Sequence, residues 1–316
     1  MRDRNLGRSG LLVSLVGLGC NNFGGRCDLD ATRQVVHKAL DLGITLFDTA
    51  DVYPITSFGV SEDFLGRVLG PRRREVVLAT KFGYGYHGAD PSRGASRRHI
   101  ITSVEASLTR LATDWIDLFQ LHEPDPRTPI EETLRALDDL VRQGKVRYIG
   151  CSNMAAWQAV EAAWTSRHHG LAPFVSAQEE YSLVARGIEA ELLPAIEAYG
   201  LGLLPFFPLA SGLLTGKYTR AAPPPANARL AGAPTLAQRF LTEANWQVIE
   251  ALEGFCAVRG RTLLELAMSW LAARPAVASI IAGATRPEQV EANVKAVGWA
   301  LTPEDLAEID RLSLNG

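Results

Sequence analysis

The sequence predicts an α/β fold: a single (β/α)₈ barrel of the TIM type, with an N-terminal β-hairpin and extra C-terminal helices. Eight short apolar runs occur along the chain, the first beginning at Val16, and a helical pattern follows each of them. The runs are continuously apolar, which is typical of parallel strands covered on both faces. No shift in composition marks a domain boundary, so residues 1–316 are interpreted as one domain.

The hairpin is expected at the start of the chain, where residues 5–6 and 11–13 flank the turn-rich segment 7–10. The eight strands are expected at 16–19, 44–47, 76–80, 116–121, 146–151, 174–177, 202–205 and 278–282. Periodic apolar residues predict helices at 29–42, 61–69, 97–111, 130–142, 154–164, 188–199, 240–258, 263–271, 287–296 and 303–312. Ser61 is expected to cap the second helix, and residues 220–234, rich in Ala and Pro, form a surface loop.

An open doubly wound sheet is the structural alternative. Such sheets carry a G-x-G-x-x-G fingerprint that opens a helix. Gly17 and Gly19 begin the pattern, but Asn22 occupies the third glycine position, and no helix is expected there. The phosphate-loop motif G-x-x-x-x-G-K-[ST] is also missing from the sequence. The closed barrel is therefore favoured.

Composition excludes several functional classes. The 316 residues are 47% hydrophobic with a net charge of -3, which gives no attraction to nucleic acid or an anionic membrane. The four cysteines lack zinc-ligand spacing and are too few for a disulfide scaffold, so no metal and a reduced, cytoplasmic setting are expected. The apolar run at 11–16 is too short to span a membrane and precedes no signal-cleavage pattern.

Four polar residues stand at or just beyond three successive strands: Asp48, Tyr53, Lys81 and His122. The carboxyl ends of barrel strands meet at one face, so these side chains are expected to converge there. An ammonium favours the phenolate and would lower the pKa of Tyr53, while a carboxylate would hold Lys81. An imidazole can orient a carbonyl group and stabilise oxyanion charge. The group suits proton transfer to a carbonyl oxygen whose carbon receives hydride from a nicotinamide or flavin.

Each residue also has a structural explanation. Asp48 could cap a turn, and Tyr53, which precedes a proline, could be an ordinary loop aromatic. Lys81 could be a solvated charge at a strand end, and His122 could be a packing residue. Their joint placement at one face favours the catalytic interpretation.

Motifs along nearly the whole chain resemble the aldo-keto reductases. They are L-F-D-T-A-D-V-Y at 46–53, A-T-K at 79–81, L-H at 121–122, G-K-V-R-Y-I-G-C-S-N at 144–153, Q-E-E-Y-S-L at 178–183, S-G-L-L-T-G-K-Y at 211–218 and G-A-T-R-P-E-Q-V-E-A-N at 283–293. The resemblance implies the barrel, an NAD(P)H cofactor and carbonyl reduction or alcohol oxidation. It implies Tyr53 as the acid, Asp48 and Lys81 as the groups that tune it, and His122 as the group that orients the carbonyl.

The resemblance also implies a cofactor site. Ser152 and Asn153, with Gln178 beside them, would bind the carboxamide, and Phe206 would stack on the nicotinamide. Asn153 could also cap the next helix, and Phe206 could be a core residue. Arg229 would reach over the pyrophosphate. The remaining implied cofactor residues are Gly19, Cys20, Asn21, Leu209, Ser211, Gly212, Lys217, Gly283, Arg286, Gln289 and Asn293.

Two departures from the family bear on specificity. Many members carry Lys where this chain has Gly283 and Arg where it has Gln289. Arg286 could compensate by binding a 2′-phosphate, so NADP(H) is favoured over NAD(H). The loop 54–59 is longer than in short members and is expected to shape the substrate entrance. A small aldehyde, ketone or sugar would be bound by Asn22, Phe23, Phe82 and Tyr84.

Two rival functions remain. Some relatives are channel-associated regulatory subunits that bind cofactor, but these have Asn at the position of His122 as we interpret the resemblance. A lyase or aldolase barrel could use Lys81 as a Schiff-base nucleophile, which borohydride trapping would detect. The substrate, the reaction direction and the oligomeric state are left open.

Overall fold

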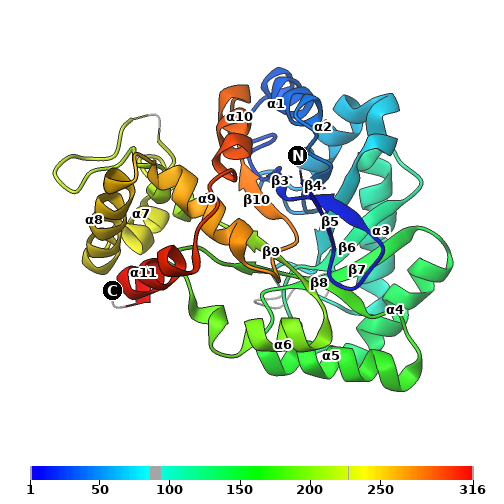
Figure 1. Ribbon diagram of the computed structural model, residues 1–316. Helices are drawn as coiled ribbons and strands as arrows, with labels where there is room; N and C mark the ends of the chain where they lie inside the picture. Colours follow the sequence, from blue (N-terminus) through cyan, green and yellow to red (C-terminus); the bar gives the residue numbers. More distant parts are fainter. Residues whose placement is uncertain (1, 86–93, 227, 315–316) are drawn as a thin grey trace.

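Figure 1 shows the protein as a computed structural model that describes residues 2–85, 94–226 and 228–314, a barrel of parallel strands surrounded by helices. Each strand pairs in parallel with its neighbours. In spatial order the strands are β10 (Ile280–Gly283), β3 (Val16–Gly19), β4 (Leu46–Asp48), β5 (Val77–Phe82), β6 (Ile116–Leu121), β7 (Val146–Ser152), β8 (Phe174–Glu180) and β9 (Gly202–Phe206).

Two backbone hydrogen bonds bring the ends of this sheet together. Leu203, in β9, donates to the carbonyl of Ala276 at 2.8 Å and accepts from the N–H of Ala278 at 2.9 Å. Residues 276–278 lie just before β10, so β9 meets the segment that leads into the first strand of the ring. The predicted eight-stranded barrel is confirmed.

Helices cover the outside of the barrel, and α7, α8 and α11 gather beyond β9 and β10 (Figure 1). The α-helices of the described residues are α1 (Leu29–Asp41), α2 (Val60–Leu69), α3 (Arg97–Leu111), α4 (Ile130–Arg142), α5 (Ala156–His169), α6 (Leu192–Tyr199), α7 (Pro234–Phe240), α8 (Glu243–Val258), α9 (Leu263–Ala273), α10 (Pro287–Ala296) and α11 (Pro303–Leu314). The 3₁₀ turns are η1 (Gly70–Glu75), η2 (Gly187–Glu189) and η3 (Ala210–Thr215).

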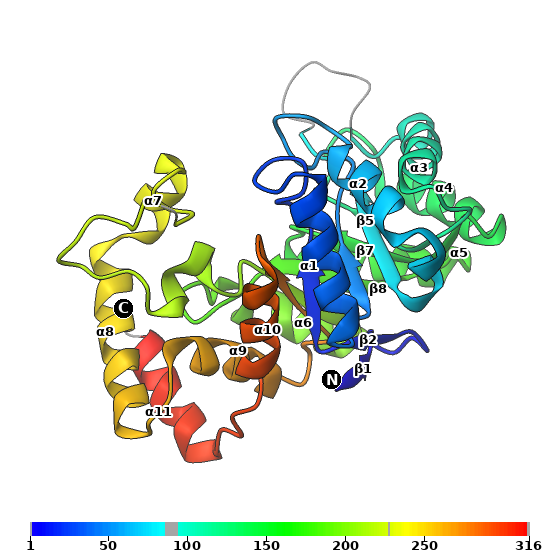
Figure 2. The same ribbon diagram turned by 90° about the horizontal axis from the view of Figure 1, so that it is seen from above.

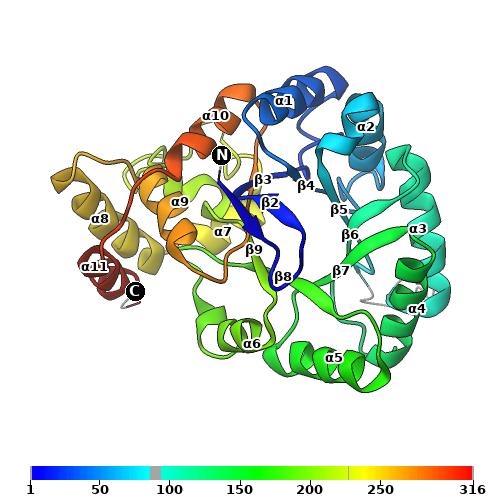
Figure 3. The same cartoon turned by 45° about the vertical axis from the view of Figure 1, so that its right-hand side comes forward.

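The N-terminal hairpin closes the amino end of the barrel. It consists of β1 (Asp3–Asn5) and β2 (Leu12–Ser14), which pair antiparallel. Leu6 and Val13 are fully buried in one cluster with Leu46 of β4 and Leu118 of β6. Figures 2 and 3 show the hairpin lying across one end of the ring. Because this end is plugged by apolar side chains, the other end is left for chemistry.

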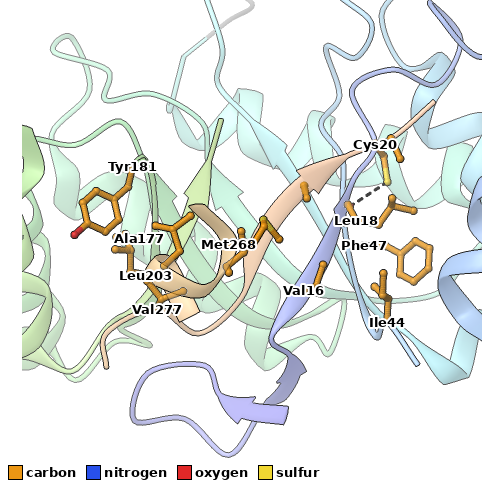
Figure 4. Packing of buried hydrophobic residues seen from close by; sticks show 14 of the residues in the cluster. Val16, Leu18, Cys20, Ile44, Phe47, Ala177, Tyr181, Leu203, Met268 and Val277 are labelled. Atoms are coloured by element: carbon orange, nitrogen blue, oxygen red, sulfur yellow. Dashed lines mark hydrogen bonds between the residues drawn. The ribbon is translucent and has the colours of Figure 1, made fainter. Parts of the chain in front are cut away.

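A second, larger apolar layer lies between the strands and the helices. Figure 4 shows Val16 and Leu18 of β3 beside Ile44 and Phe47 on one side of this layer, and Tyr181, Ala177, Leu203, Met268 and Val277 on the other. Residues on a strand alternate between the barrel interior and this outer layer. The continuous apolar runs in the sequence reflect burial on both faces.

Four details of the predicted elements were wrong. Gly59, with φ +82°, stands at the N-cap of α2, and Ser61 lies inside the helix, where its hydroxyl bonds Cys20 O and Thr49 Oγ1. The helix expected at 188–199 is broken into η2 and α6, which places Pro194 in the first turn, where a missing N–H is tolerated. The helix expected at 240–258 begins only at Glu243, because Thr242 caps α8, and Phe240 is the last residue of α7. The helix expected at 154–164 begins only at residue 156.

The packing of the hairpin against the barrel requires glycine at position 7. Gly7 has φ +60°, and a Cβ there would lie 2.5 Å from the carbonyl oxygen of Gly200, 2.6 Å from the N of Gly202 and 2.7 Å from the carbonyl oxygen of Val175. Gly7→Ala should therefore lower the free energy of unfolding by about 2–3 kcal/mol. Gly170→Ala is the matched control, because its φ is +61° and nothing lies within 4 Å of its Cβ. Equal urea midpoints for the two variants would contradict this close packing of the hairpin against the barrel.

Candidate active site

A cavity of about 820 Å³ opens at the carboxyl ends of the barrel strands. Its walls come from the carboxyl-terminal residues of β3, β4, β7, β8, β9 and β10 and from the segments that follow the strands. Most of the predicted site residues line it: Gly19, Cys20, Asn21, Asn22, Asp48, Tyr53, Tyr84, His122, Ser152, Asn153, Gln178, Phe206, Leu209, Ser211, Gly212, Lys217, Arg229, Gly283, Arg286, Gln289 and Asn293.

A buried ion pair forms the floor of the cavity. Lys81 Nζ donates to Asp48 Oδ2 at 2.6 Å and to the carbonyl of Thr49 at 2.9 Å, and the lysine side chain is fully buried. The other carboxylate oxygen, Asp48 Oδ1, accepts from Gln120 Nε2 at 3.1 Å and Gln178 Nε2 at 2.8 Å. Burial is the largest single effect and lowers the pKa of Lys81, but the charge and hydrogen bond of Asp48, together with Tyr53 and Cys20, outweigh it, and the pKa is raised. Lys81 is therefore an ammonium at neutral pH.

Tyr53 lies next to this ammonium. Lys81 Nζ is 5.2 Å from the centroid of the phenol ring. Burial raises the pKa of Tyr53, the charge of Lys81 lowers it and the charge of Asp48 raises it, with a net increase. The predicted lowering by Lys81 is present, but desolvation outweighs it. Tyr53 therefore carries its proton at neutral pH, as a proton donor must.

His122 is a neutral imidazole at the same mouth. Burial, followed by the charge of Lys81, holds its pKa well below the ordinary value of 6.5. Its ring meets Tyr53 edge-on, with centroids 5.7 Å apart, and lies 4.9 Å from the ring of Tyr84. Within the described part of the chain, His122 Nδ1 is buried without a hydrogen-bond partner. A neutral imidazole can donate one hydrogen bond to a carbonyl oxygen.

The backbone fixes these side chains. The N–H of His122 donates to the carbonyl of Phe82 at 2.8 Å, so the ends of β5 and β6 are joined. The N–H of Tyr53 donates to the carbonyl of Ala50, and the Tyr53 carbonyl accepts from the N–H of Ser61. The loop after β4 is therefore held at both sides of the tyrosine.

The segment after β7 presents amide and hydroxyl groups. Ser152 Oγ donates to the carbonyl of Gln178 at 2.6 Å, and Asn153 Nδ2 donates to the carbonyl of His122 at 3.0 Å. Asn153 has φ +56°, and Ala155 stands at the N-cap of α5, so the alternative that Asn153 caps this helix is wrong. Its side chain instead joins the segment after β7 to the segment after β6.

The turn after β9 is shaped for an anionic group. Ser211 and Gly212 have φ of +57° and +96°. Ser211 Oγ is buried without a partner among the described residues, and a Cβ at Gly212 would lie 2.7 Å from Lys217 Nζ. An unpaired hydroxyl, a close backbone approach and a lysine together fit a pyrophosphate.

Four cations line this half of the cavity: Arg26, Lys217, Arg229 and Arg286. Burial lowers the pKa of Lys217, and Arg26 and Arg286 lower it further. Burial and then Arg26 likewise lower the pKa of Arg229. None of the four forms an ion pair within the portion of the chain that the structure describes. Unpaired cations that repel one another favour binding of an anion.

The segment after β10 explains one family departure. A Cβ at Gly283 would make a tight contact with Asn22 Nδ2, at 3.3 Å, and an ordinary one with Asn21 Oδ1, at 3.5 Å, so a lysine there would require Asn22 to shift. Gln289 Oε1 accepts from the N–H of Thr285 at 2.7 Å and from its hydroxyl. Gln289 thus holds the loop that precedes α10, and Arg286 stands at the N-cap of that helix.

Two predicted substrate residues are corrected. Phe23 and Phe82 are fully buried and lie outside the cavity wall. Phe82 follows Lys81 on β5, so its side chain takes the other face of the strand, where it stacks on Phe119 at 4.6 Å. Ile55, in the loop after Tyr53, lines the mouth and is 61% exposed, which supports the predicted role of that loop.

Several site residues were missed in the sequence. Gln120 is buried beneath the cavity, and the wall includes Arg26, Glu123, Phe207 and Leu236. Gln120 could have been found from the sequence, because it is a polar residue in an apolar strand, two positions before His122, and a buried polar side chain needs a hydrogen-bond partner. The other four lie on loops or on a helix outside the ring, and the strand pattern does not predict their reach.

Metal sites and membrane-spanning helices are both absent from the described residues. In residues 2–85, 94–226 and 228–314, no group of three His, Cys, Asp or Glu could hold a metal ion. Within the same ranges, every helix is too short or too polar to cross a membrane.

Comparison with known proteins agrees with the site. The model of the Aldo/keto reductase family matches residues 15–314. The chain is 38% identical, over 99% of its length and 96% of the relative's, to a probable voltage-gated potassium channel subunit beta of Arabidopsis thaliana. It is 34% identical to the L-glyceraldehyde 3-phosphate reductase of Escherichia coli (strain K12), covering 100% and 93%. An uncharacterized oxidoreductase of Bacillus subtilis (strain 168) is 37% identical, covering 95% and 92%.

The fold and site define a barrel oxidoreductase. The chain belongs to the aldo/keto reductase family, whose members depend on nicotinamide cofactors. The predicted resemblance is confirmed.

Asp51, two residues before Tyr53, predicts a pH effect on stability. Burial, followed by the charge of Glu62, raises the pKa of Asp51 from 3.8 to about 7, against Arg110 and Lys81. The folded protein thus retains a proton that the unfolded chain releases, and stability falls as the pH rises from 4 to 7. Asp51→Asn should remove this loss, so that its Tm exceeds that of the wild type by about 3 °C at pH 8 but not at pH 4.

The control is Asp114→Asn, at an exposed position. Its Tm should follow the wild type at every pH. Parallel pH profiles for wild type and Asp51→Asn would contradict the buried-proton interpretation.

Proposed function

We propose that the protein reduces aldehyde, ketone or sugar carbonyls with NAD(P)H, or oxidises the corresponding alcohols. The observation that carries this proposal is the ion pair of Lys81 with Asp48, 2.6 Å long and buried directly beside Tyr53. A buried pair is costly to desolvate, and here it faces a phenol and an imidazole at the mouth of a cavity. Proton transfer gives that arrangement a purpose.

In the proposed mechanism Tyr53 is the general acid. Its hydroxyl donates a proton to the carbonyl oxygen, and the Lys81 ammonium stabilises the phenolate that remains. Asp48 keeps Lys81 charged and in place. Neutral His122 donates a hydrogen bond to the same oxygen and so orients the carbonyl. A bound reduced nicotinamide supplies the hydride that the carbonyl carbon accepts. In alcohol oxidation the Tyr53 phenolate takes the proton back.

The other half of the cavity supports the choice of a dinucleotide. Ser152 and Asn153 would hold the carboxamide, and Ser211, Lys217 and Arg229 would hold the pyrophosphate. Phe206 would stack on the nicotinamide ring. Arg286, at the start of α10, would bind a 2′-phosphate, which favours NADP(H) over NAD(H). Gly19, Cys20, Asn21, Leu209, Gly212, Gly283, Gln289 and Asn293 would line the remainder of the dinucleotide.

The substrate is proposed to be small. Ile55, Tyr84 and Asn22 line the wall of the cavity beside the quartet. The Escherichia coli relative acts, by its name, on a three-carbon aldehyde phosphate. We therefore propose short aldehydes, with and without a phosphate, as the first substrates to assay. We also propose that residues 1–316 form one domain and that the protein acts in the cytoplasm, where its four buried free cysteines would stay reduced.

A regulatory role is the alternative proposal, because relatives 38% identical are probable channel beta subunits. Both functions would require cofactor binding, so binding alone does not separate them. Turnover of an aldehyde that requires Tyr53 would favour the enzyme. Tight NADPH binding with no turnover across an aldehyde panel would favour the regulatory subunit.

Removing the proposed acid should abolish turnover and leave binding intact. Tyr53→Phe should lower kcat/KM for an aldehyde by at least about 10²-fold, the usual contribution of a general acid. NADPH affinity, measured by quenching of tryptophan fluorescence, should stay close to that of the wild type. Tyr84→Phe is the matched control, a second phenol at the same mouth, and its kcat should change far less. A Tyr53→Phe enzyme with normal kcat would exclude the proposed mechanism.

Two substitutions should separate the phosphates of the cofactor. Arg286→Ala should weaken NADPH binding by about 10–100-fold, the loss of charged hydrogen bonds, and leave NADH binding unchanged. Lys217→Met should weaken both cofactors similarly, because both carry the pyrophosphate. Fluorescence titration with each cofactor measures these changes. Equal losses for both cofactors in Arg286→Ala would place Arg286 away from the 2′-phosphate.

A further inference from the structure

The segment Ser152–Asn153–Met154 has an uncommon backbone conformation at the cavity wall. Asn153 has φ +56°, in the left-handed region, which asparagine adopts more often than other non-glycine residues but still only in a minority of cases. Its Nδ2 donates to the carbonyl of His122 at 3.0 Å and to Ser152 Oγ at 3.1 Å. Such a conformation persists only where the surroundings hold it in place.

Two consecutive residues of β8 hold this segment. The carbonyl of Gln178 accepts from the N–H of Asn153 at 3.3 Å and from Ser152 Oγ at 2.6 Å. The side chain of Glu179 points to the opposite face of the strand, and its Oε1 accepts from the N–H of Met154 at 3.1 Å. β8 therefore accepts hydrogen bonds from two successive N–H groups, those of Asn153 and Met154, and so holds the backbone on both sides of Asn153.

Glu179 is an unusual choice for a purely structural position. It is only 6% exposed and has no ion-pair partner within the described residues. Burial raises the pKa of Glu179 to about 8, although the N–H groups of Met154 and Asn153 act to lower it. A buried acid without a counter-ion costs free energy. Its side-chain Oε1 accepts from the N–H of Met154, in the segment that carries Asn153.

We propose that Glu179 is a positioning residue for the nicotinamide end of the cofactor. By holding the N–H of Met154, it fixes Asn153 in its left-handed conformation and so keeps Ser152 and Asn153 aimed at the carboxamide. The inference rests on the proposed function, in which those two residues bind the carboxamide. Glu179 touches neither the cavity nor the reacting atoms, and it acts through the backbone.

The surroundings of Glu179 allow the role to be tested without unfolding the protein. Glu179 lines a second, open hollow of about 440 Å³, together with Ile188, Glu191 and Leu192, and Asn153 lines both this hollow and the main cavity. When the side chain of Glu179 is shortened to alanine, water from this hollow can satisfy the N–H of Met154. Water does not fix the backbone as a side chain on a strand does, so the loss should appear in positioning.

The test compares a nicotinamide cofactor with the same molecule lacking nicotinamide. The probes are NADPH and 2′-phospho-ADP-ribose, titrated by calorimetry against the wild type, Glu179→Ala and Glu179→Gln. If the wild type prefers NADH, then NADH and ADP-ribose replace them. We expect Glu179→Ala to bind NADPH about tenfold more weakly, as for loss of one hydrogen bond to a buried group, and to bind the fragment unchanged.

Two further variants sharpen the result. Glu179→Gln keeps an Oε1 acceptor at the same place and should restore NADPH affinity close to that of the wild type. Glu191→Ala is the control for charge in the same hollow and should change neither probe. Glu179→Asp, which shortens the acceptor by one methylene, should weaken NADPH selectively and serves as the test if Glu179→Ala does not fold.

Three outcomes would overturn the proposal: unchanged NADPH binding in Glu179→Ala, or in Glu179→Asp where that variant serves as the test; equal weakening of both probes; or no recovery in Glu179→Gln. A folded wild type that binds neither NADPH nor NADH would instead contradict the proposed function. The two failures are therefore distinguishable.

Discussion

The arrangement of the carboxyl end of the barrel depends on one interaction, the buried ion pair of Asp48 and Lys81. Desolvating two charges costs more than their attraction returns unless further hydrogen bonds complete the site. Here the carbonyl of Thr49 accepts from the ammonium, and Gln120 and Gln178 donate to the carboxylate. These groups come from β4, β5, β6 and β8, or directly follow them, so the pair fixes how four strand ends meet.

Burial and the same pair set the state of the groups above it. Burial, and then the charge of Lys81, hold the pKa of His122 down, and the charge of Lys81 opposes the larger increase that burial imposes on the pKa of Tyr53. The result at neutral pH is a protonated phenol beside a neutral imidazole. A carbonyl oxygen would find two hydrogen-bond donors without a full charge on either, and the ammonium behind them would stabilise the phenolate after proton transfer.

The parts of the site that the sequence predicts correctly follow from the order of the strands and from the alternation of side chains along each strand. Asp48, Lys81 and His122 stand at strand ends, and a parallel barrel brings such ends together. The errors have equally physical causes. Phe82 was placed in the pocket because it adjoins Lys81, yet adjacent residues of a strand face opposite sides. Arg26 was missed because its approach to Lys217 and Arg229 arises from loop packing, which the local pattern does not encode. Ser61 satisfies the sequence rule for an N-cap, but its hydroxyl instead donates to the carbonyl of Cys20 in the loop after β3.

Sequence identity does not separate the two functions found among the relatives, since a channel subunit matches at 38% and a reductase at 34%. Free energy offers a better criterion. The cations along the cavity would serve dinucleotide binding in either function. A buried Lys81, a desolvated phenol and an imidazole whose pKa is lowered by burial each cost stability, and such groups are typical of sites of proton transfer. A chain that retains all three at one mouth retains the physical requirements of proton transfer, which favours the enzyme over the sensor.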